Sequence, residues 1–394
     1  MHTQSSVPAV VVGGSLNGLG VVRSLARDGV DIYLIETNRK CPAAWSRFCT
    51  LVRAESLDGE ALLRCLEQLS TTLGVRAVLI LTDEPAVCTV SAQRVRLAPL
   101  YHFDLPEPTA VEMLSDKVAF QQWAEVQGLP VPRSRALHSE ADLSTLDALG
   151  PPLVLKPADK RLVLAGLVER AVRVENLDEA RRVAAGMLCH TTSLIAQEWI
   201  EGPDSDIYFV LFWTDQKSRA AALFPGRKLV CSPPAVGSTA ICMAAPELAE
   251  PLCAITRDFL TRVDYRGFGS VEFKRDVRSG RLLIIEPTVG RTDWQEEIAT
   301  LCGVNLPLLA YQTALKIAPQ LDSVPSGKPL VWRSDWRIPL PPKFPPRTRV
   351  IDGHFRWADP LPAVYYYGHE QLAQRIARRL SRSARHIFTN LGVF

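Results

Sequence analysis

Glu272 and Glu286 lie on the two predicted strands of a single β-hairpin. The residues around Glu272 alternate between apolar and charged, which is the period of a half-buried strand. Ser279-Gly280 supplies turn chemistry, and the wholly apolar run 282–285 predicts the second strand. If the loop between the strands holds three or five residues, Glu272 sits directly opposite Glu286.

Two opposed carboxylates have a specific chemical consequence. Like charges that face each other across a sheet destabilise it by up to about 1 kcal/mol. In a partly buried site the pair must share a proton or bind a cation, and Mg²⁺ prefers carboxylate oxygens and completes its shell with substrate phosphates. Arg291, a few residues further on, adds a planar fork suited to phosphate or carboxylate. The hairpin is therefore interpreted as a Mg–nucleotide site, and the alternative is an exposed hairpin with two solvated glutamates.

Length and composition indicate a globular protein with several domains. The chain has 394 residues, of which 47% are hydrophobic and 22% charged, so two to four domains or subdomains are expected. A net charge of +3 does not support a nucleic-acid partner. Nine scattered cysteines indicate reduced thiols rather than a zinc site. With no signal peptide and no apolar run of the ~20 residues that cross a bilayer, we expect a cytoplasmic protein without a membrane partner.

The first hundred residues alternate strand and helix signals. A continuous apolar strand, 9–12, leads into the glycine-rich turn Gly13 to Gly20 and a helix, and a second strand ends at Glu36. This βαβ pattern predicts a Rossmann-like domain over residues 1–105. The glycine spacing does not fit G-x-G-x-x-G, although Glu36 stands where a ribose-binding acid would. An NAD-dependent oxidoreductase that uses this turn is therefore kept as an alternative function.

Two lysines in the next segment stand where a cation needs a partner. Ser115 is expected to cap a helix over Asp116 to Gln127, and Lys117 lies in its first turn, where the helix dipole disfavours a cation. Lys156 ends a short apolar strand, 151–157, and needs a partner in such surroundings. Taken alone, Lys117 is equally explained as a solvated lysine beside Asp116.

Several short motifs together carry a family resemblance. In chain order they are SDK, VLKP, QEWIEG, GRK, VEFKRD and IIEPTVGR. In this order, over residues 8–315, the chain resembles the ATP-grasp superfamily, and more narrowly its carboxylate–amine ligases of the carbamoyl-phosphate-synthase-like and D-aspartate-ligase-like group. The resemblance implies an α/β and α+β protein in which the Rossmann-like domain is followed by a two-lobed ATP-grasp fold and a small C-terminal segment. The expected boundaries are 106–195 for the first lobe, 196–319 for the second lobe and 320–394 for the C-terminal segment.

The resemblance also implies roles for individual residues, with ATP and Mg²⁺ as cofactors. Lys117 and Lys156 match the lysines that hold the ATP phosphates. The linker strand whose backbone reads adenine matches Gln197, Glu198, Trp199 and Ile200. One of Glu201, Asp204 and Asp206 would lie near the ribose, and the choice among them stays open. Glu272 and Glu286 match the magnesium-binding glutamates, and Arg291 the arginine that faces the γ-phosphate and acyl phosphate. Arg227 and Lys228 match a basic pair near the phosphates or the acceptor.

The chain departs from the family pattern at two places. Thr288 replaces the usual asparagine as third metal ligand, and Arg291 follows later than usual. The loop 158–166 after Lys156 holds one glycine where the family has a glycine-rich loop over the phosphates. Residues 157–190 are the candidate lid, and His190 is considered as a base although a structural role is favoured. An inactive ATP-binding scaffold stays open as an alternative.

The implied reaction activates a carboxylate as an acyl phosphate and joins it to an amine, with an amino acid expected and with release of ADP and phosphate. Both substrates are small molecules whose identity stays open. Beyond residue 319, a basic helix is expected over Gln371 to Phe388, with arginines at helical spacing: Arg375, Arg378, Arg382 and Arg385. A solvated face is the favoured reading of these arginines. An anionic carrier or precursor is the alternative partner, and a homodimer also stays open.

Overall fold

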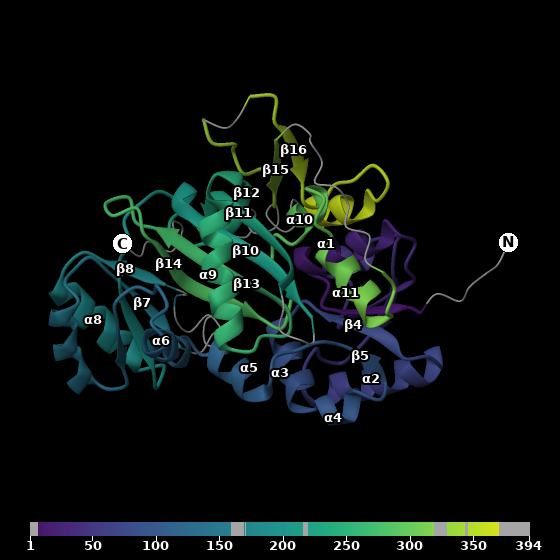
Figure 1. Cartoon of the computed structure of the whole chain (residues 1–394), viewed down its shortest axis with the longest axis horizontal. Helices are drawn as coiled ribbons and strands as arrows, with labels where there is room; N and C mark the ends of the chain where they lie inside the picture. Colours follow the sequence, from purple (N-terminus) through teal and green to yellow (C-terminus); the bar gives the residue numbers. More distant parts are fainter. Residues whose placement is uncertain are drawn as a thin grey trace, which may run out of the picture.

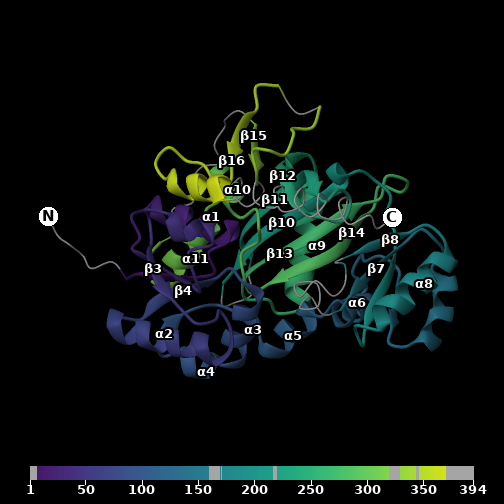
Figure 2. The same cartoon turned by 180° about the vertical axis from the view of Figure 1, so that it is seen from behind.

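A computed structural model describes residues 7–158, 169, 171–215, 220–318, 329–342 and 346–369. They form three sheets, which Figure 1 shows side by side, with the largest sheet in the middle. The N-terminal sheet lies on one side of it and a small four-stranded sheet on the other, as Figure 2 shows from behind. This arrangement confirms a mixed α/β protein.

The N-terminal sheet is parallel, with five strands in the order β3-β2-β1-β4-β5. Helix α1 covers one face and α2 and α3 cover the other, which is why β1 and β4 read as unbroken apolar runs. Its elements are β1 (Ala9–Val12), α1 (Leu16–Ala26), β2 (Ile32–Glu36), η1 (Pro42–Trp45), β3 (Thr50–Arg53), α2 (Gly59–Leu73), β4 (Ala77–Leu81), α3 (Glu84–Ala92), α4 (Arg94–Leu97) and β5 (Tyr101–His102).

The protein's own groups close the glycine-rich turn after β1. A Cβ on Gly18 would lie 2.0 Å from the carbonyl oxygen of Gly13, so this glycine allows α1 to start against the end of β1. A Cβ on Gly14 would lie 2.4 Å from the Cys41 sulfur. The Glu36 carboxylate accepts hydrogen bonds from the backbone N–H of Gly14, at 2.8 Å, and from that of Thr37, at 2.7 Å. Glu36 therefore holds the turn itself, and these contacts do not favour a dinucleotide there.

The small sheet has four antiparallel strands in the order β6-β9-β7-β8. Helix α8 and the 3₁₀ segment η2 pack on one face with a hydrophobic core of their own, and α6 lies near the other face. The elements of this unit are α5 (Pro108–Ser115), α6 (Lys117–Val126), β6 (Ser134–Leu137), η2 (Glu140–Ala148), β7 (Leu153–Pro157), β8 (Val172–Val174), α8 (Leu177–Leu188) and β9 (Leu194–Glu198).

The N-cap of α6 differs from the predicted one. Asp116, not Ser115, accepts the hydrogen bonds from the backbone N–H groups of Val118 and Ala119, because Ser115 still belongs to α5. Lys117 is consequently the first residue of α6 and lies at the positive end of the helix dipole.

The central sheet has seven strands in the order β14-β13-β10-β11-β12-β15-β16. Helix α9 packs on one face, while α1, α10 and α11 pack on the other. Strands β15 and β16, which the sequence assigns to a separate C-terminal segment, continue this sheet through the pairing of β15 with β12. The elements are η3 (Asp204–Asp206), β10 (Ile207–Thr214), β11 (Ala220–Ser232), β12 (Ser238–Ala244), η4 (Pro246–Leu248), α9 (Ala249–Arg262), β13 (Gly267–Arg275), β14 (Leu282–Val289), α10 (Glu297–Leu301), α11 (Leu306–Ala314), β15 (Leu330–Arg333) and β16 (Arg349–Asp352).

The N-terminal domain and the central sheet share their hydrophobic cores. One core combines Val10 and Leu79 with Val271 and Phe273, and the other combines α1 with β10. A buried hydrogen-bond pair adds to this contact, because the Asn17 side chain donates to the Thr292 carbonyl at 2.8 Å and accepts from its hydroxyl. The domain is thus fixed against the loop that follows β14.

Two of the sequence expectations fall outside the described residues. The first is most of the loop after Lys156, which includes Lys160 and Arg161, and the second is the basic helix from Gln371. The described part of the candidate lid includes β8 and α8, which pack on the small sheet. Among the described helices, none combines the length and the apolar character needed to cross a bilayer.

The close approach at Gly18 predicts a strong effect of a single methyl group. Gly18→Ala should destabilise the fold by roughly 1–3 kcal/mol or more, because a backbone oxygen cannot move aside as a flexible side chain can. Gly186→Ala is the matched control: it lies within α8 with open space around its Cα and should raise stability by about 0.5–1 kcal/mol. Melting temperatures of the two variants test this, and equal shifts would contradict it.

Candidate active site

The predicted pairing of Glu272 with Glu286 is confirmed, but the loop expected to produce it is not the one observed. The loop spans residues 276–281, an even number, and pairs Arg275 with Leu282. A register shift between Glu272 and Phe273 then leaves Ile285 as an extra residue, which restores the Glu272–Glu286 pair. A bulge therefore brings the two carboxylates onto the same face of the sheet.

Lys228 compensates one of the two carboxylates. Its ammonium lies 2.5 Å from Glu272 Oε2, and its side chain is 4% exposed compared with 26% for Glu272. Burial is the largest single influence and lowers the pKa of Lys228, but the charge of Glu272, its hydrogen bond and the other acidic groups nearby together outweigh burial, so the pKa is raised. Lys228 therefore stays charged and holds Glu272 in place.

An open cavity between the small sheet and the central sheet collects most of the predicted residues. It is lined by both lysines, by the linker strand and by both glutamates: Lys117, Lys156, Gln197, Glu198, Trp199, Ile200, Glu272 and Glu286. They come from α6, β7, β9 and the two residues after it, β13 and β14, which are segments far apart in the sequence. The structure thus brings two lysines, the linker residues 197–200 and two opposed glutamates together in one cavity.

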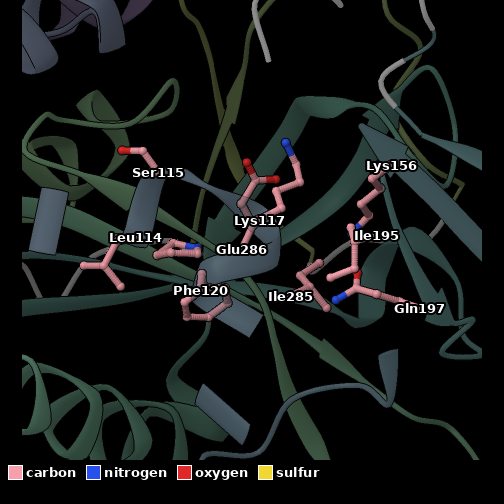
Figure 3. A pocket seen from close by; sticks show the side chains of 10 residues that line it. Leu114, Ser115, Lys117, Phe120, Lys156, Ile195, Gln197, Ile285 and Glu286 are labelled. Carbon is pink, nitrogen blue, oxygen red and sulfur yellow. The ribbon is translucent and has the colours of Figure 1, made fainter. Parts of the chain in front are cut away.

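The lysines enter the cavity from two different elements. Figure 3 shows Lys117, Lys156, Gln197 and Glu286 around one hollow, which Ile195 and Ile285 also line. The Lys156 ammonium donates to the side-chain oxygen of Gln197 at 3.0 Å, and the Gln197 amide donates to Gln121 on α6 at 2.7 Å. Lys156 is therefore oriented by a hydrogen-bonded chain that ties β7 and β9 to α6.

The linker that follows β9 forms the wall of the cavity. Glu198 accepts hydrogen bonds from the backbone and side chain of Arg133, at 3.0 and 2.9 Å, which fix its carboxylate. The Arg173 guanidinium lies over the Trp199 ring, 4.7 Å from the centroid of that ring. Ile200 is buried and lines the cavity. An apolar wall with an aromatic residue suits a planar base.

Next along the chain, the acidic turn is held by the protein itself. Asp204 accepts from the backbone N–H groups of Cys231 and Ala235, at 2.8 and 2.9 Å. Glu201 lies 3.8 Å from Arg173, and Asp206 is 9% exposed. None of the three is among the residues that line the described cavity, and their assignment to a ribose stays a prediction.

Three further candidate residues, Arg227, Arg291 and His190, are not among those that line the described cavity. Arg227 and Lys228 are neighbours on β11, so their side chains point to opposite faces of the sheet. Arg227 stacks on Tyr208 and approaches Glu247 at 3.5 Å, on the face that α9 covers. Arg291 approaches Glu84 of the N-terminal domain at 4.0 Å. His190 is exposed at the end of α8.

Thr288 occupies a position next to the glutamate pair. It pairs with Ser270 across the hairpin, one step along the same face from Glu286 and Glu272. A hydroxyl at this place can supply a hard oxygen ligand, and its assignment as a metal ligand stays a prediction.

Sequence reasoning missed three polar residues near this face. Lys274 lines the cavity and donates to the carbonyls of Gly202 and Pro203, both at 2.7 Å. Asp293 accepts from the Ser270 hydroxyl at 2.8 Å. Glu296 is 2% exposed, and burial, followed by the charge of Asp293, raises its pKa to about 8. Alternation in VEFKRD could have placed Lys274 beside Glu272, whereas no local pattern marks Asp293 or Glu296.

The donor set fits a magnesium ion that shares its shell with phosphates. Within the described ranges, no group of three or more His, Cys, Asp or Glu side chains is arranged to hold a metal ion by itself. Two opposed carboxylates supply part of a shell of hard oxygen ligands. Two lysines line the same cavity and can bind phosphates, whose oxygens would complete that shell. The cavity therefore fits a Mg–nucleotide better than a bare ion.

Comparisons with known proteins agree with this geometry. No family model matches the chain. The chain is 23% identical to a D-aspartate ligase from Enterococcus faecium (strain Aus0004) over 322 residues, which cover 75% of this chain and 74% of that protein.

Solved structures show the same architecture. An ADP complex of PurK, N5-carboxyaminoimidazole ribonucleotide synthetase, superposes with a TM-score of 0.63 at 16% identity, covering 83% of this chain and 81% of that one. The biotin carboxylase domain of Hydrogenobacter thermophilus 2-oxoglutarate carboxylase, with MgADP and bicarbonate, gives 0.61 at 14% identity, covering 80% and 71%. The chain has the ATP-grasp fold. Its sequence is similar to that of a D-aspartate ligase.

The buried ion pair predicts an asymmetric response to mutation. Glu272→Gln leaves Lys228 buried without its carboxylate and should cost about 3 kcal/mol, the low end of the range for a broken buried pair because Glu272 is 26% exposed. Lys228→Met should cost less, since Glu272 can be hydrated. Asp258→Asn, which breaks an exposed pair with Arg262 on α9, should change stability by less than about 1 kcal/mol. Melting temperatures without Mg²⁺ or nucleotide test this order, and a larger loss for Lys228→Met would refute it.

The raised pKa of Glu296 predicts a pH-dependent stability. Between pH 4.5, the ordinary pKa of a glutamate, and the pKa of about 8 in the folded chain, the folded chain holds a proton that the unfolded chain has released. Stability therefore falls as pH rises through this window. Glu296→Gln removes the effect, so the variant should gain in melting temperature relative to the wild type between pH 5 and pH 8. A difference that does not change with pH would contradict the prediction, and Glu250→Gln, exposed on α9, is the control.

Proposed function

We propose that the chain is an ATP-dependent ligase that forms an amide bond between a carboxylate and an amine, with release of ADP and phosphate. The γ-phosphoryl group of ATP passes to the carboxylate, and the amine attacks the resulting acyl phosphate. One observation carries the proposal: a single cavity unites two lysines, an apolar linker strand and two opposed glutamates. The ADP and MgADP complexes of structures with this fold support ATP and Mg²⁺ as its cofactors.

Different cavity residues contact different parts of the nucleotide. The backbone of Gln197, Glu198, Trp199 and Ile200 faces adenine, while Lys117 and Lys156 supply positive charge to the phosphates. Lys117 acts from the N-terminus of α6, so the helix dipole adds to its charge. Lys156 is held by Gln197, which limits its freedom before the ligand arrives.

Glu272 and Glu286 hold the magnesium, with Thr288 as the proposed third ligand. When bound, Mg²⁺ neutralises phosphate oxygens during phosphoryl transfer. The Lys228 ammonium holds the Glu272 carboxylate in place through their ion pair. Thr288 stands one step further along that face, where its hydroxyl extends the row of oxygens.

Activation of the carboxylate explains why such a site is needed. Hydroxide is a poor leaving group, so a carboxylate does not acylate an amine in water, whereas an acyl phosphate does. The similarity to a ligase named for D-aspartate supports an amino acid as one of the two substrates. Arg291, on the loop after β14, is proposed to face the acyl phosphate, and Arg227 the acceptor, although in this structure both contact neighbouring acids.

A substitution at the metal pair tests the proposal. Glu286→Gln should abolish ADP release that requires Mg²⁺, a carboxylate and an amine together, because the remaining carboxylate cannot position the metal. A coupled assay over a panel of amino acids and carboxylates measures this, with Glu250→Gln as the control that keeps full turnover.

ATP turnover unaffected by Glu286→Gln would refute the assignment. If Mg-ATP raises the melting temperature but no substrate mixture releases ADP, the chain is a nucleotide-binding scaffold instead. NAD(H) binding that is lost on substitution in the turn Gly13 to Gly20 would favour the oxidoreductase alternative.

A further inference from the structure

Lys274 is a buried lysine on the wall of the cavity that has no part in the proposed binding of phosphates, metal or base. It lies two residues from Glu272 on the same face of β13, roughly 7 Å along the strand, and both residues line the cavity. The residue is 7% exposed. Its ammonium donates to the carbonyl oxygens of Gly202 and Pro203, both at 2.7 Å. Lys274 is therefore directed toward the chain just after the linker.

The turn that accepts these hydrogen bonds packs closely against the end of β13. The Val277 N–H, just beyond β13, donates to the Glu201 carbonyl at 3.1 Å. Gly202 has a φ of 145°, and a Cβ there would lie 3.1 Å from a methyl group of Val277 and 3.3 Å from the Arg275 carbonyl oxygen. Contacts this tight leave little room for a side chain, so the turn lies directly on the end of the strand.

The acidic residues of the same turn compensate the buried ammonium. Burial lowers the pKa of Lys274, and the negative charges of Asp206, Asp204 and Glu201 oppose this effect. Asp204 also accepts a hydrogen bond from the backbone N–H of Ala235, at 2.9 Å, and Ala235 lines the cavity. The turn thus connects Lys274 with a second wall of the cavity.

The linker between β9 and this turn is anchored at its two ends by different sheets. At its start the Trp199 N–H donates to the Pro152 carbonyl, next to β7 of the small sheet, at 3.0 Å. At its end the hydrogen bonds of Lys274 hold the chain to the central sheet. Ile200 lies between the two anchors and lines the cavity. The position of the linker relative to the metal pair on β13 and β14 therefore depends on the contacts of Lys274.

We propose that Lys274 is a positioning residue for the nucleoside part of ATP: it fixes Gly202 and Pro203 to β13 and thereby holds the linker where it faces the base. The inference rests on the proposed ATP site, because it explains how the base-binding wall of that site is held. A wall that is fixed before the ligand arrives loses less conformational freedom on binding, which raises affinity. The contacts to phosphate and metal come from other residues and remain when Lys274 is changed.

Binding without substrates tests this role, with Mg-ATP and Mg-tripolyphosphate as the two probes. Tripolyphosphate has the phosphates and no nucleoside, so it reports on the phosphate and metal site alone. In calorimetric titrations Lys274→Met should weaken Mg-ATP binding by about tenfold or more and change the affinity for Mg-tripolyphosphate by less than about threefold. Lys40→Met, exposed after β2, is the matched control and should leave both affinities unchanged.

Lys274→Gln keeps the test valid if Lys274→Met does not fold. Its amide can still donate to one of the two carbonyls, so it should lose less Mg-ATP affinity than Lys274→Met. Equal losses of affinity for the two probes, or unchanged Mg-ATP binding in both variants, overturn the role of Lys274.

Kinetics separate this proposal from the proposed function. In the ADP-release assay Lys274→Met should raise KM for ATP by about tenfold or more while kcat stays within about threefold, a split that loss of folded protein does not produce. A fall in kcat without a rise in KM overturns the proposal. If the wild type binds Mg-ATP but no substrate mixture releases ADP, the ligase assignment fails and the two-probe comparison still decides the role of Lys274. A wild type that binds no Mg-ATP overturns both.

Discussion

The opposition of Glu272 and Glu286 is the constraint around which the site is arranged. Two carboxylates on facing strands are unfavourable unless positive charge lies close to them. The chain meets this need with Lys228 from within the same sheet and with two lysines from the opposite side of the cavity. Since those lysines belong to α6 and β7, the cavity exists only when the small sheet is folded and docked against the central one.

The central sheet links this site to the rest of the molecule. Its site face carries Glu272 and Lys274 at the cavity end, while the apolar residues further along pack against α1 and α11.

Local patterns in the sequence predict the elements of the site better than their exact contacts. Alternation around Glu272 and the apolar run after Gly280 predict both strands, and the ordered motifs predict which residues meet in the cavity. The pairing of the glutamates depends on the bulge at Ile285, and a bulge leaves no signature in alternation. The family resemblance pairs Arg227 with Lys228 as one basic site. The period of two in a strand places these adjacent residues on opposite faces of the sheet.

Other features could not be predicted because they depend on contacts distant in the chain. Asp293 becomes notable only through its hydrogen bond with Ser270, and Glu296 only through its burial. Strand β15 pairs with β12 although α9, the β13–β14 hairpin, α10 and α11 separate the two in the sequence. Glu36 matched a ribose-binding acid by position, yet its contact with Gly14 shows that the same position serves to close the turn.

The distribution of hydrophobic cores has a mechanical consequence. The N-terminal domain and the central sheet are joined by two shared cores, whereas the small sheet, with η2 and α8, has a core made solely of its own residues between 137 and 196. Because this core contains no residue of the other two units, its packing does not depend on how the small sheet sits against the central sheet. The cavity is thus bounded on one side by a sheet whose hydrophobic core is its own.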